Sequence, residues 1–178
     1  MRPIAVTMGC PVGVGPEILL RFFETLEHST EFPPVVLGDY TVLSRTAEQL
    51  RLRAEPVLWE PGNGIRPGTV PVMALSQLDT DKLLWGKPTQ DTSIAMADYI
   101  HAAVRHTRRG DFAAMVTCPI SKKALNNAVK AAEAEKKREA AKQRAIKEFV
   151  AKWEQEHKKR QVKRKPAKKK TSKKKVTA

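Results

Sequence analysis

The sequence lacks the features that define several large classes of protein. It contains only two cysteines, Cys10 and Cys118, among 178 residues, which is too few for a disulfide framework. No apolar stretch approaches the ~18 residues that a membrane-spanning helix needs. No signal peptide is expected, because Arg2 and Pro3 lead into only a short apolar run. We therefore expect a cytoplasmic protein with no membrane partner.

Net charge is also missing from most of the chain, although the net charge of the whole is +14. Residues 1–128 contain 13 Lys and Arg and 13 Asp and Glu, so this segment is neutral. The last 50 residues contain 20 basic and 6 acidic residues and account for the entire net charge. Such an asymmetry predicts a neutral globular segment followed by a basic extension.

The neutral segment alternates short apolar runs with stretches of helical periodicity. Strands are expected at residues 4–8, 34–39, 56–59, 70–75 and 112–117. Helices are expected over residues 16–26, 42–50 and 92–108, the last with its inward face formed by Ile94, Ala97, Ile100, Ala103 and Val104. This alternation predicts an α/β fold with a mainly parallel sheet.

Two loops are predicted to share one edge of that sheet, because ligands of parallel sheets bind beyond the carboxyl ends of the strands. The first loop carries Gly9, Gly13 and Gly15, and the second runs from Thr117 to Lys122. The glycines fit either a tight turn or backbone contact with a ligand. Lys122 could contact an anion, or its side chain could be solvated. The loop is neither a P-loop nor a complete G-x-G-x-x-G motif.

Three blocks match one known family in order and in spacing. Residues 4–17 read Ile-Ala-Val-Thr-Met-Gly-Cys-Pro-Val-Gly-Val-Gly-Pro-Glu, residues 35–39 read Val-Val-Leu-Gly-Asp, and residues 115–125 read Met-Val-Thr-Cys-Pro-Ile-Ser-Lys-Lys-Ala-Leu. Residues 1–128 therefore resemble the 4-hydroxythreonine-4-phosphate dehydrogenase family. The resemblance implies part of the parallel-sheet lobe of an isocitrate/isopropylmalate dehydrogenase-like fold. It also implies a homodimer in pyridoxal phosphate biosynthesis that oxidises and then decarboxylates its substrate, with NAD and a divalent metal (zinc, magnesium or cobalt) as cofactors.

The sequence departs from the family after the third block. A Pro-Gly-His-Thr-Glu motif that contacts substrate in the family is absent, and His28, His101, His106 and His157 match none of its three metal-ligand positions. No catalytic residue and no metal ligand is therefore assigned, the cofactor-binding residues stay unknown, and enzymatic activity is left open.

The two cysteines lie on the same predicted edge of the sheet. Cys10 stands where the family pattern has Asp, so a thiol replaces an acidic group there. Cys10 and Cys118 could approach each other as a metal or redox pair, but without a C-x-x-C spacing a structural role is the alternative.

The basic extension divides into a helix and a tail. Residues 129–160 are rich in Ala, Lys and Glu and predict a charged helix, and residues 161–178 predict a Lys-rich disordered tail. The lysines and arginines of residues 158–175 indicate non-specific nucleic-acid binding, with a solubilising or accidental extension as the alternative.

Self-association is a further expectation. The family's sheet is completed by strands that this sequence lacks, so apolar edges of the fragment are expected to be exposed. An apolar stripe at residues 146–153 of the charged helix could fold back and cover them.

Overall fold

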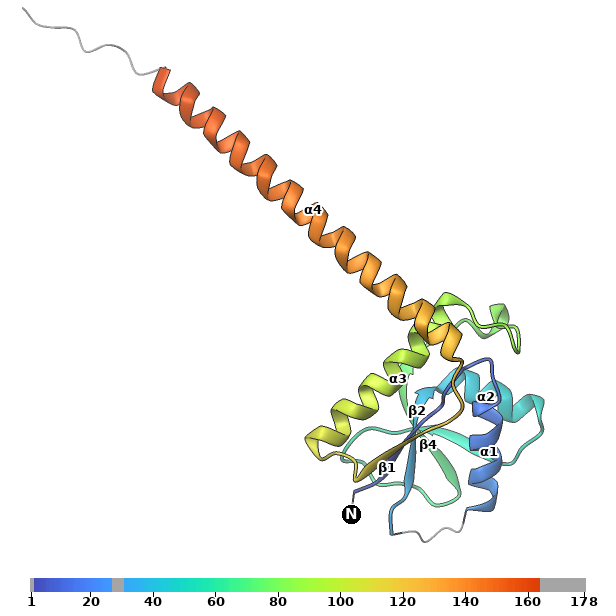
Figure 1. Cartoon of the computed structure of the whole chain (residues 1–178). Coiled ribbons are helices and arrows are strands. Elements are labelled where there is room, and N and C mark those ends of the chain that lie inside the picture. The colour runs from blue at the N-terminus through green and yellow to red at the C-terminus, as the bar shows by residue number, and fades with distance from the viewer. Residues whose placement is uncertain (1, 27–30, 164–178) are drawn as a thin grey trace, which may run out of the picture. The chain divides into compact units, whose positions relative to one another are not determined.

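The chain forms a parallel α/β fold followed by one long helix. A computed structural model describes residues 2–26 and 31–163, with side chains described as far as Glu154. It divides into two compact units, Met1–Ala132 and Glu133–Ala178. The first unit contains the whole sheet and helices α1 to α3 (Figure 1). The boundary expected at residue 128 stays a prediction.

The sheet has five strands in the order β3-β4-β2-β1-β5, and each neighbouring pair is parallel. The strands are β1 (Ile4–Thr7), β2 (Pro34–Asp39), β3 (Glu55–Leu58), β4 (Thr69–Ser76) and β5 (Ala114–Thr117). Every predicted strand is present. The last is shorter than the expected residues 112–117, because Phe112, although buried in the core, precedes the strand.

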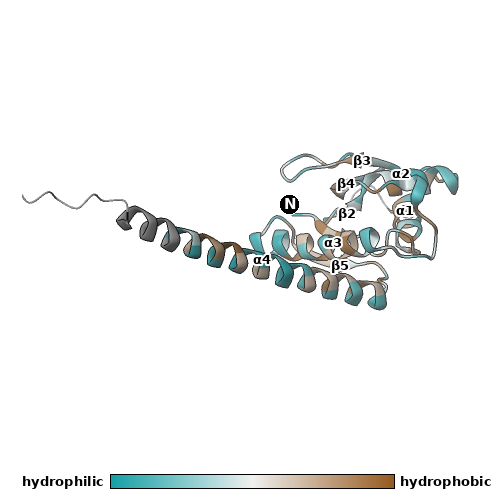
Figure 2. Cartoon of the chain, turned by 90° about the horizontal axis from the view of Figure 1, so that it is seen from above, coloured by the Kyte–Doolittle hydropathy of each residue, from teal (hydrophilic) through white to brown (hydrophobic). Residues whose placement is uncertain are grey.

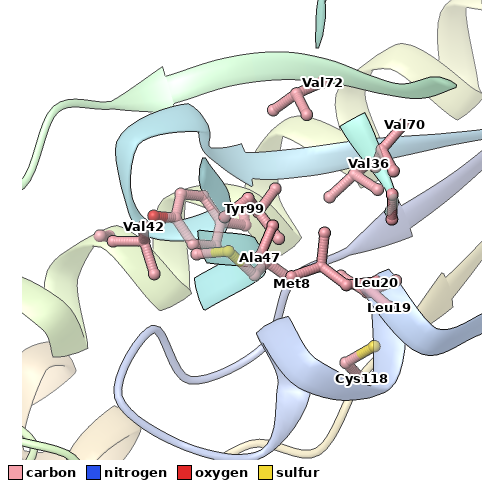
Figure 3. Packing of buried hydrophobic residues seen from close by; sticks show 13 residues of the cluster. Met8, Leu19, Leu20, Val36, Val42, Ala47, Val70, Val72, Tyr99 and Cys118 are labelled. Carbon is pink, nitrogen blue, oxygen red and sulfur yellow. The ribbon is translucent and has the colours of Figure 1, made fainter. Parts of the chain in front are cut away.

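Helices cover both faces of the sheet. Helices α1 (Gly15–Thr25) and α2 (Tyr40–Gln49) lie on one face, and α3 (Gln90–Arg109) lies on the other (Figure 1). The α1 and α2 face buries Leu19, Leu20 and Ala47 in one cluster with Val36 and Val72 of the sheet (Figure 3). A second cluster, on the α3 face, contains Ala5, Val35, Leu37, Trp59, Ala102, Ala103 and Phe112.

The predicted inward face of α3 was wrong, because a different side of the helix faces the sheet. Ala103 is buried as expected, but Ile94 and Val104 are 41% and 40% exposed. The buried stripe consists mainly of smaller residues together with Met96 and Tyr99. A capping box at Thr89 fixes the start of the helix, and small side chains allow the helix to approach the sheet closely. Hydrophobicity alone selected the wrong flank.

Helix α4 (Lys122–Lys163) is one continuous helix of 42 residues. Its first turns belong to the first unit, where Ala124 and Ala128 are buried. It includes residues 161–163, which were expected to belong to the disordered tail; the rest of that tail lies outside the described residues. No described helix is long and apolar enough to cross a membrane.

Candidate functional site

The two predicted loops meet at the carboxyl edge of the sheet. β1 and β5 are adjacent strands, with Thr7 opposite Thr117 in the register. The backbone N–H of Cys10 donates to the carbonyl of Pro119 over 3.2 Å, and that of Cys118 donates to the carbonyl of Thr7 over 3.1 Å. The structure therefore brings together the two segments that the sequence placed on one edge.

The glycines of the first loop allow this close approach. Gly9 has a φ of +73°, and a Cβ there would collide with the carbonyl oxygen of Pro119. A Cβ on Gly15 would collide with the carbonyl oxygen of Met8. Gly13 donates its N–H to the carbonyl of Cys10 over 2.9 Å in a tight turn. Packing and turn geometry account for all three glycines, and backbone fills the space beside Gly9 and Gly15.

The polar residues of the second loop are accessible. Thr117 ends β5 with an exposed side chain, and Lys122 is exposed at the first position of α4. Thr7, opposite Thr117, is fully buried, and its hydroxyl has no hydrogen-bond partner in the described part of the chain. Ligand contact by Thr117 or Lys122 stays a prediction.

Two cavities border this edge. One of about 340 Å³ lies beside the glycine loop and is lined by Val12, Val14, Glu17, Leu50 and Trp85. The loop that carries Trp85 is held there because the N–H of Gly86 donates to the carbonyl of Val12 over 2.7 Å. The other cavity, about 420 Å³, lies between the start of α3 and the first turns of α4, and is lined by Gln90, Ser93, Ser121, Lys123 and Asn127 among others.

A buried polar cluster that the sequence did not predict holds the neighbouring strand ends together. The Asp39 carboxylate is fully buried and accepts hydrogen bonds from the Thr41 hydroxyl (2.5 Å), the Val42 N–H (3.0 Å), the Ser76 hydroxyl (2.7 Å) and the Leu78 N–H (2.8 Å). The Ser76 hydroxyl also lies 2.6 Å from the Tyr99 hydroxyl. Burial raises the pKa of Tyr99 well above its usual range.

This cluster connects β2, β4 and α3. Asp39 also serves as the N-cap of α2, which begins two residues earlier than the predicted residue 42. An Asp shortly before a predicted helix is the sequence feature that indicates such a role. The partners Ser76 and Tyr99 are 37 and 60 residues away along the chain, so no local pattern identifies them.

Both cysteines are buried free thiols. Cys10 packs with Val12, Met96 and Ala124, whereas Cys118 packs in the cluster beneath α1 (Figure 3). Burial raises the pKa of the Cys118 thiol, which disfavours its nucleophilic thiolate form. This packing favours the structural interpretation of the two cysteines over the redox pair.

The described residues contain no group of three or more His, Cys, Asp or Glu side chains that could hold a metal ion. His101 is exposed, and His106 pairs through Nδ1 with Asp111 over 2.7 Å. His28 and the side chain of His157 lie outside the described residues.

Comparisons with known proteins identify relatives of this fold. A sequence model of the family described as pyridoxal phosphate biosynthetic protein PdxA matches residues 30–154. The chain is 39% identical over 127 residues to the 4-hydroxythreonine-4-phosphate dehydrogenase of Desulforapulum autotrophicum, covering 70% of this chain and 37% of that protein. It is 32% identical over 130 residues to a "Putative D-threonate 4-phosphate dehydrogenase" of Symbiobacterium thermophilum, covering 71% of this chain and 39% of that protein.

A solved structure agrees with these matches. The 4-hydroxythreonine-4-phosphate dehydrogenase from Burkholderia phymatum superposes with a TM-score of 0.65 at 26% sequence identity. The superposition covers 71% of this chain and 39% of that structure. The chain thus spans less than two fifths of the length of these relatives.

Proposed function

Because this chain belongs to the family of the pyridoxal phosphate biosynthetic protein PdxA, we propose that it carries part of an NAD- and divalent-metal-dependent dehydrogenase acting on a 4-phosphorylated hydroxy acid. The names of the relatives, 4-hydroxythreonine-4-phosphate and D-threonate 4-phosphate dehydrogenase, support this substrate class. The reaction transfers a hydride from the substrate alcohol to NAD, and the resulting 3-keto acid then loses carbon dioxide. The observation that carries the proposal is the family match over residues 30–154.

The residues of this chain do not fit the family's divalent metal. The described part contains no cluster of three candidate ligands, and Cys10 is packed among apolar side chains. The Asp39 carboxylate already accepts four hydrogen bonds from its neighbours, so it is not available for coordination. No step of the reaction can be assigned to a metal held by these side chains.

The glycine loop does not fit the pyrophosphate of NAD either. A phosphate-binding loop needs open space in front of its backbone N–H groups. Here the N–H of Cys10 donates to the carbonyl of Pro119 and the N–H of Gly13 donates to the carbonyl of Cys10, so both groups are already occupied. We therefore propose that this chain alone is inactive and supplies one wall of a site that other polypeptide segments complete.

The inactive state can be tested with the purified full chain. We expect no metal-dependent reduction of NAD above background with 4-phosphohydroxy-L-threonine as substrate. The Desulforapulum autotrophicum enzyme, assayed in parallel, controls for substrate and metal quality. Turnover by this chain within about tenfold of that control would contradict the proposal.

A second function is supported by the charge of the extension. Residues 129–178 contain the entire net charge of +14, and dense Lys and Arg bind nucleic-acid phosphates by releasing counterions. We propose that residues 158–175 give the chain non-specific affinity for DNA or RNA. Stacking on bases has little role in this proposal, because aromatic side chains are absent from residues 158–175.

Two variants of the full chain, in which lysines are replaced by glutamine, test whether the position of the lysines matters or only the number of charges removed. One variant replaces six of the eight lysines of the tail, Lys168, Lys169, Lys170, Lys173, Lys174 and Lys175. The matched control replaces six lysines in the first half of α4, Lys122, Lys123, Lys130, Lys136, Lys137 and Lys142. The tail variant should bind DNA much more weakly, and the slope of log Kd against log salt should fall by about 0.9 for each phosphate that it no longer neutralises. Equal weakening in both variants would refute a role specific to the tail.

A further inference from the structure

A short apolar stripe lies on the second half of α4. Ile146, Phe149, Val150 and Trp153 follow one another at i, i+3, i+4 and i+7, a spacing that places them on one face of the helix. Ile146 is 62% exposed and Phe149 is 70% exposed. Figure 2 shows this stretch of α4 in brown, the colour of apolar residues. We call these four residues the α4 stripe.

The α4 stripe is limited to about two helical turns. Residues 130–145 contain no apolar residue larger than alanine, and residues 154–163 contain only Val162. A coiled coil along the whole helix would need apolar residues at two positions of every heptad. The sequence therefore favours a short contact with another helix over a long coiled coil.

Two opposite charges flank the α4 stripe on the same side of the helix. Lys147 directly follows Ile146, and Glu154 directly follows Trp153. The two charged residues are seven positions apart, so they lie on one flank of the helix about two turns from each other. Both side chains are exposed. A positive charge thus lies beside one end of the stripe and a negative charge beside the other.

An antiparallel pair of these helices brings the opposite charges together. A two-fold axis near Val150 places Lys147 of each copy beside Glu154 of the other, so that two ion pairs form at once. The apolar side chains of the two stripes face each other across the same axis. In a parallel pair, Lys147 would instead lie level with Lys147 of the second copy. The charge pattern therefore favours the antiparallel direction.

The basic segment that follows the stripe also opposes a parallel pair. Residues 158–175 contain twelve Lys and Arg and no Asp or Glu. A parallel pair would bring both of these segments to the same end of the two helices, where like charges repel each other. An antiparallel pair separates them.

A membrane surface fits the α4 stripe less well than a second helix does. Helices that lie on anionic lipid carry mainly Lys and Arg on their polar face. Residues 146–154 contain two Lys and two Glu, so the stripe and its immediate surroundings have no net charge. This part of the helix therefore provides no attraction to anionic headgroups.

We propose that the α4 stripe binds the α4 stripe of a second copy of this chain, as an antiparallel pair of helices. The inference is independent of the proposed dehydrogenase function, because it uses no residue at the carboxyl edge of the sheet. Four side chains on each copy bury well under the roughly 1,200 Å² at the lower end of a standard interface. We therefore expect a reversible homodimer with a Kd on the order of 10–100 µM.

The test is sedimentation equilibrium of the nuclease-treated full chain over about a hundredfold range of concentration around that Kd. Phe149→Glu places a charge within the stripe. Ala151→Glu, on the opposite face of the same helix, is the matched control with the same change in charge. We expect Phe149→Glu to raise the Kd about tenfold or more and Ala151→Glu to leave it unchanged. Circular dichroism of both variants must match the parent chain, since both replaced side chains are exposed.

A charge swap tests the antiparallel direction. Lys147→Glu alone should raise the Kd about fivefold, because it places two glutamates beside each other at both contacts. Adding Glu154→Lys should restore the Kd of the parent chain, since each new glutamate then meets a new lysine of the other copy. Lys147→Glu with Glu148→Lys has the same net charge, but Glu148 lies on the opposite face of the helix and should restore nothing.

Several results would overturn the inference. They are a chain that stays monomeric at every concentration, as expected if the stripe folds back onto its own chain, and a dimer that Phe149→Glu leaves unchanged. Equal weakening by Phe149→Glu and Ala151→Glu, or equal Kd values for the two double variants, would also contradict it. Cosedimentation of a monomeric chain with vesicles of anionic phospholipid, abolished by Phe149→Glu, would assign the stripe to a membrane surface instead.

Discussion

Replacing Asp39 should show how strongly the buried polar cluster holds the strand ends together. In Asp39→Ala the acceptor of four hydrogen bonds disappears, while the donors stay in place. The N–H groups of Val42 and Leu78 and the hydroxyl of Ser76 would then lack their carboxylate partner. The N-cap of α2 would be lost in the same change.

The expected loss follows from these donors. A buried donor without a partner costs about 1–3 kcal/mol, and partial rehydration of the strand ends reduces the sum. We expect Asp39→Ala to lower the free energy of unfolding by about 4 kcal/mol, a large part of the 5–15 kcal/mol typical of a domain. Asp39→Asn keeps one acceptor oxygen but places an NH₂ group against donors, and should cost about 2 kcal/mol.

Urea unfolding followed by near-ultraviolet circular dichroism measures this change. Near-ultraviolet signals report packed aromatic residues such as Trp59 and Tyr99, whereas far-ultraviolet signals would be dominated by α4. Asp98→Asn, on the exposed side of α3, is the matched control and should change stability by less than about 0.5 kcal/mol. If Asp39→Ala and the control unfold at the same urea concentration, the four hydrogen bonds do not stabilise the fold as argued.

Three further predictions concern other buried groups. Because burial raises the pKa of Tyr99 above its ordinary 10.0, the contribution of the protonated Tyr99 to stability should be complete below pH 10.0 and lost as the pH rises further. In urea titrations at increasing pH, Tyr99→Phe should therefore lose less of its free energy of unfolding than the parent chain. Gly15→Ala should destabilise the fold by about 3 kcal/mol or more in thermal melts, because its Cβ meets backbone, whereas Gly64→Ala, with open space around it, should change little. Ellman's reagent should label Cys10 and Cys118 slowly in the folded chain and rapidly in urea, and rapid labelling of the folded chain would contradict their burial.

The sequence predicted the order of strands and helices and the parallel sheet. It succeeded because each buried strand is a short apolar run between turn residues, and β2 is buried at every position. It also placed the two loops on one edge, since the ends of parallel strands determine that arrangement. These features depend on the polarity and turn preference of residues that are close together in the sequence.

Features that depend on distant partners were missed. The rotation of α3 is fixed by its cap and by the contact of Tyr99 with Ser76, not by its most hydrophobic residues. The glycines of the first loop gave no indication that their neighbours in space would be Pro119 and Met8. Which side of a helix packs, and which backbone approaches a glycine, are properties of the assembled sheet.

The unequal margins of the sheet also limit how large an assembly can become. A sheet with two open edges can add copies without end, as fibrils do, because each addition exposes a fresh edge. In the described part of the chain, Glu55 and Pro56 protect β3 at one margin, whereas β5 at the other margin has neither a charge nor a proline, so two copies paired at β5 would leave no unprotected edge. In light scattering, association through this edge should therefore reach a fixed mass as the protein concentration rises.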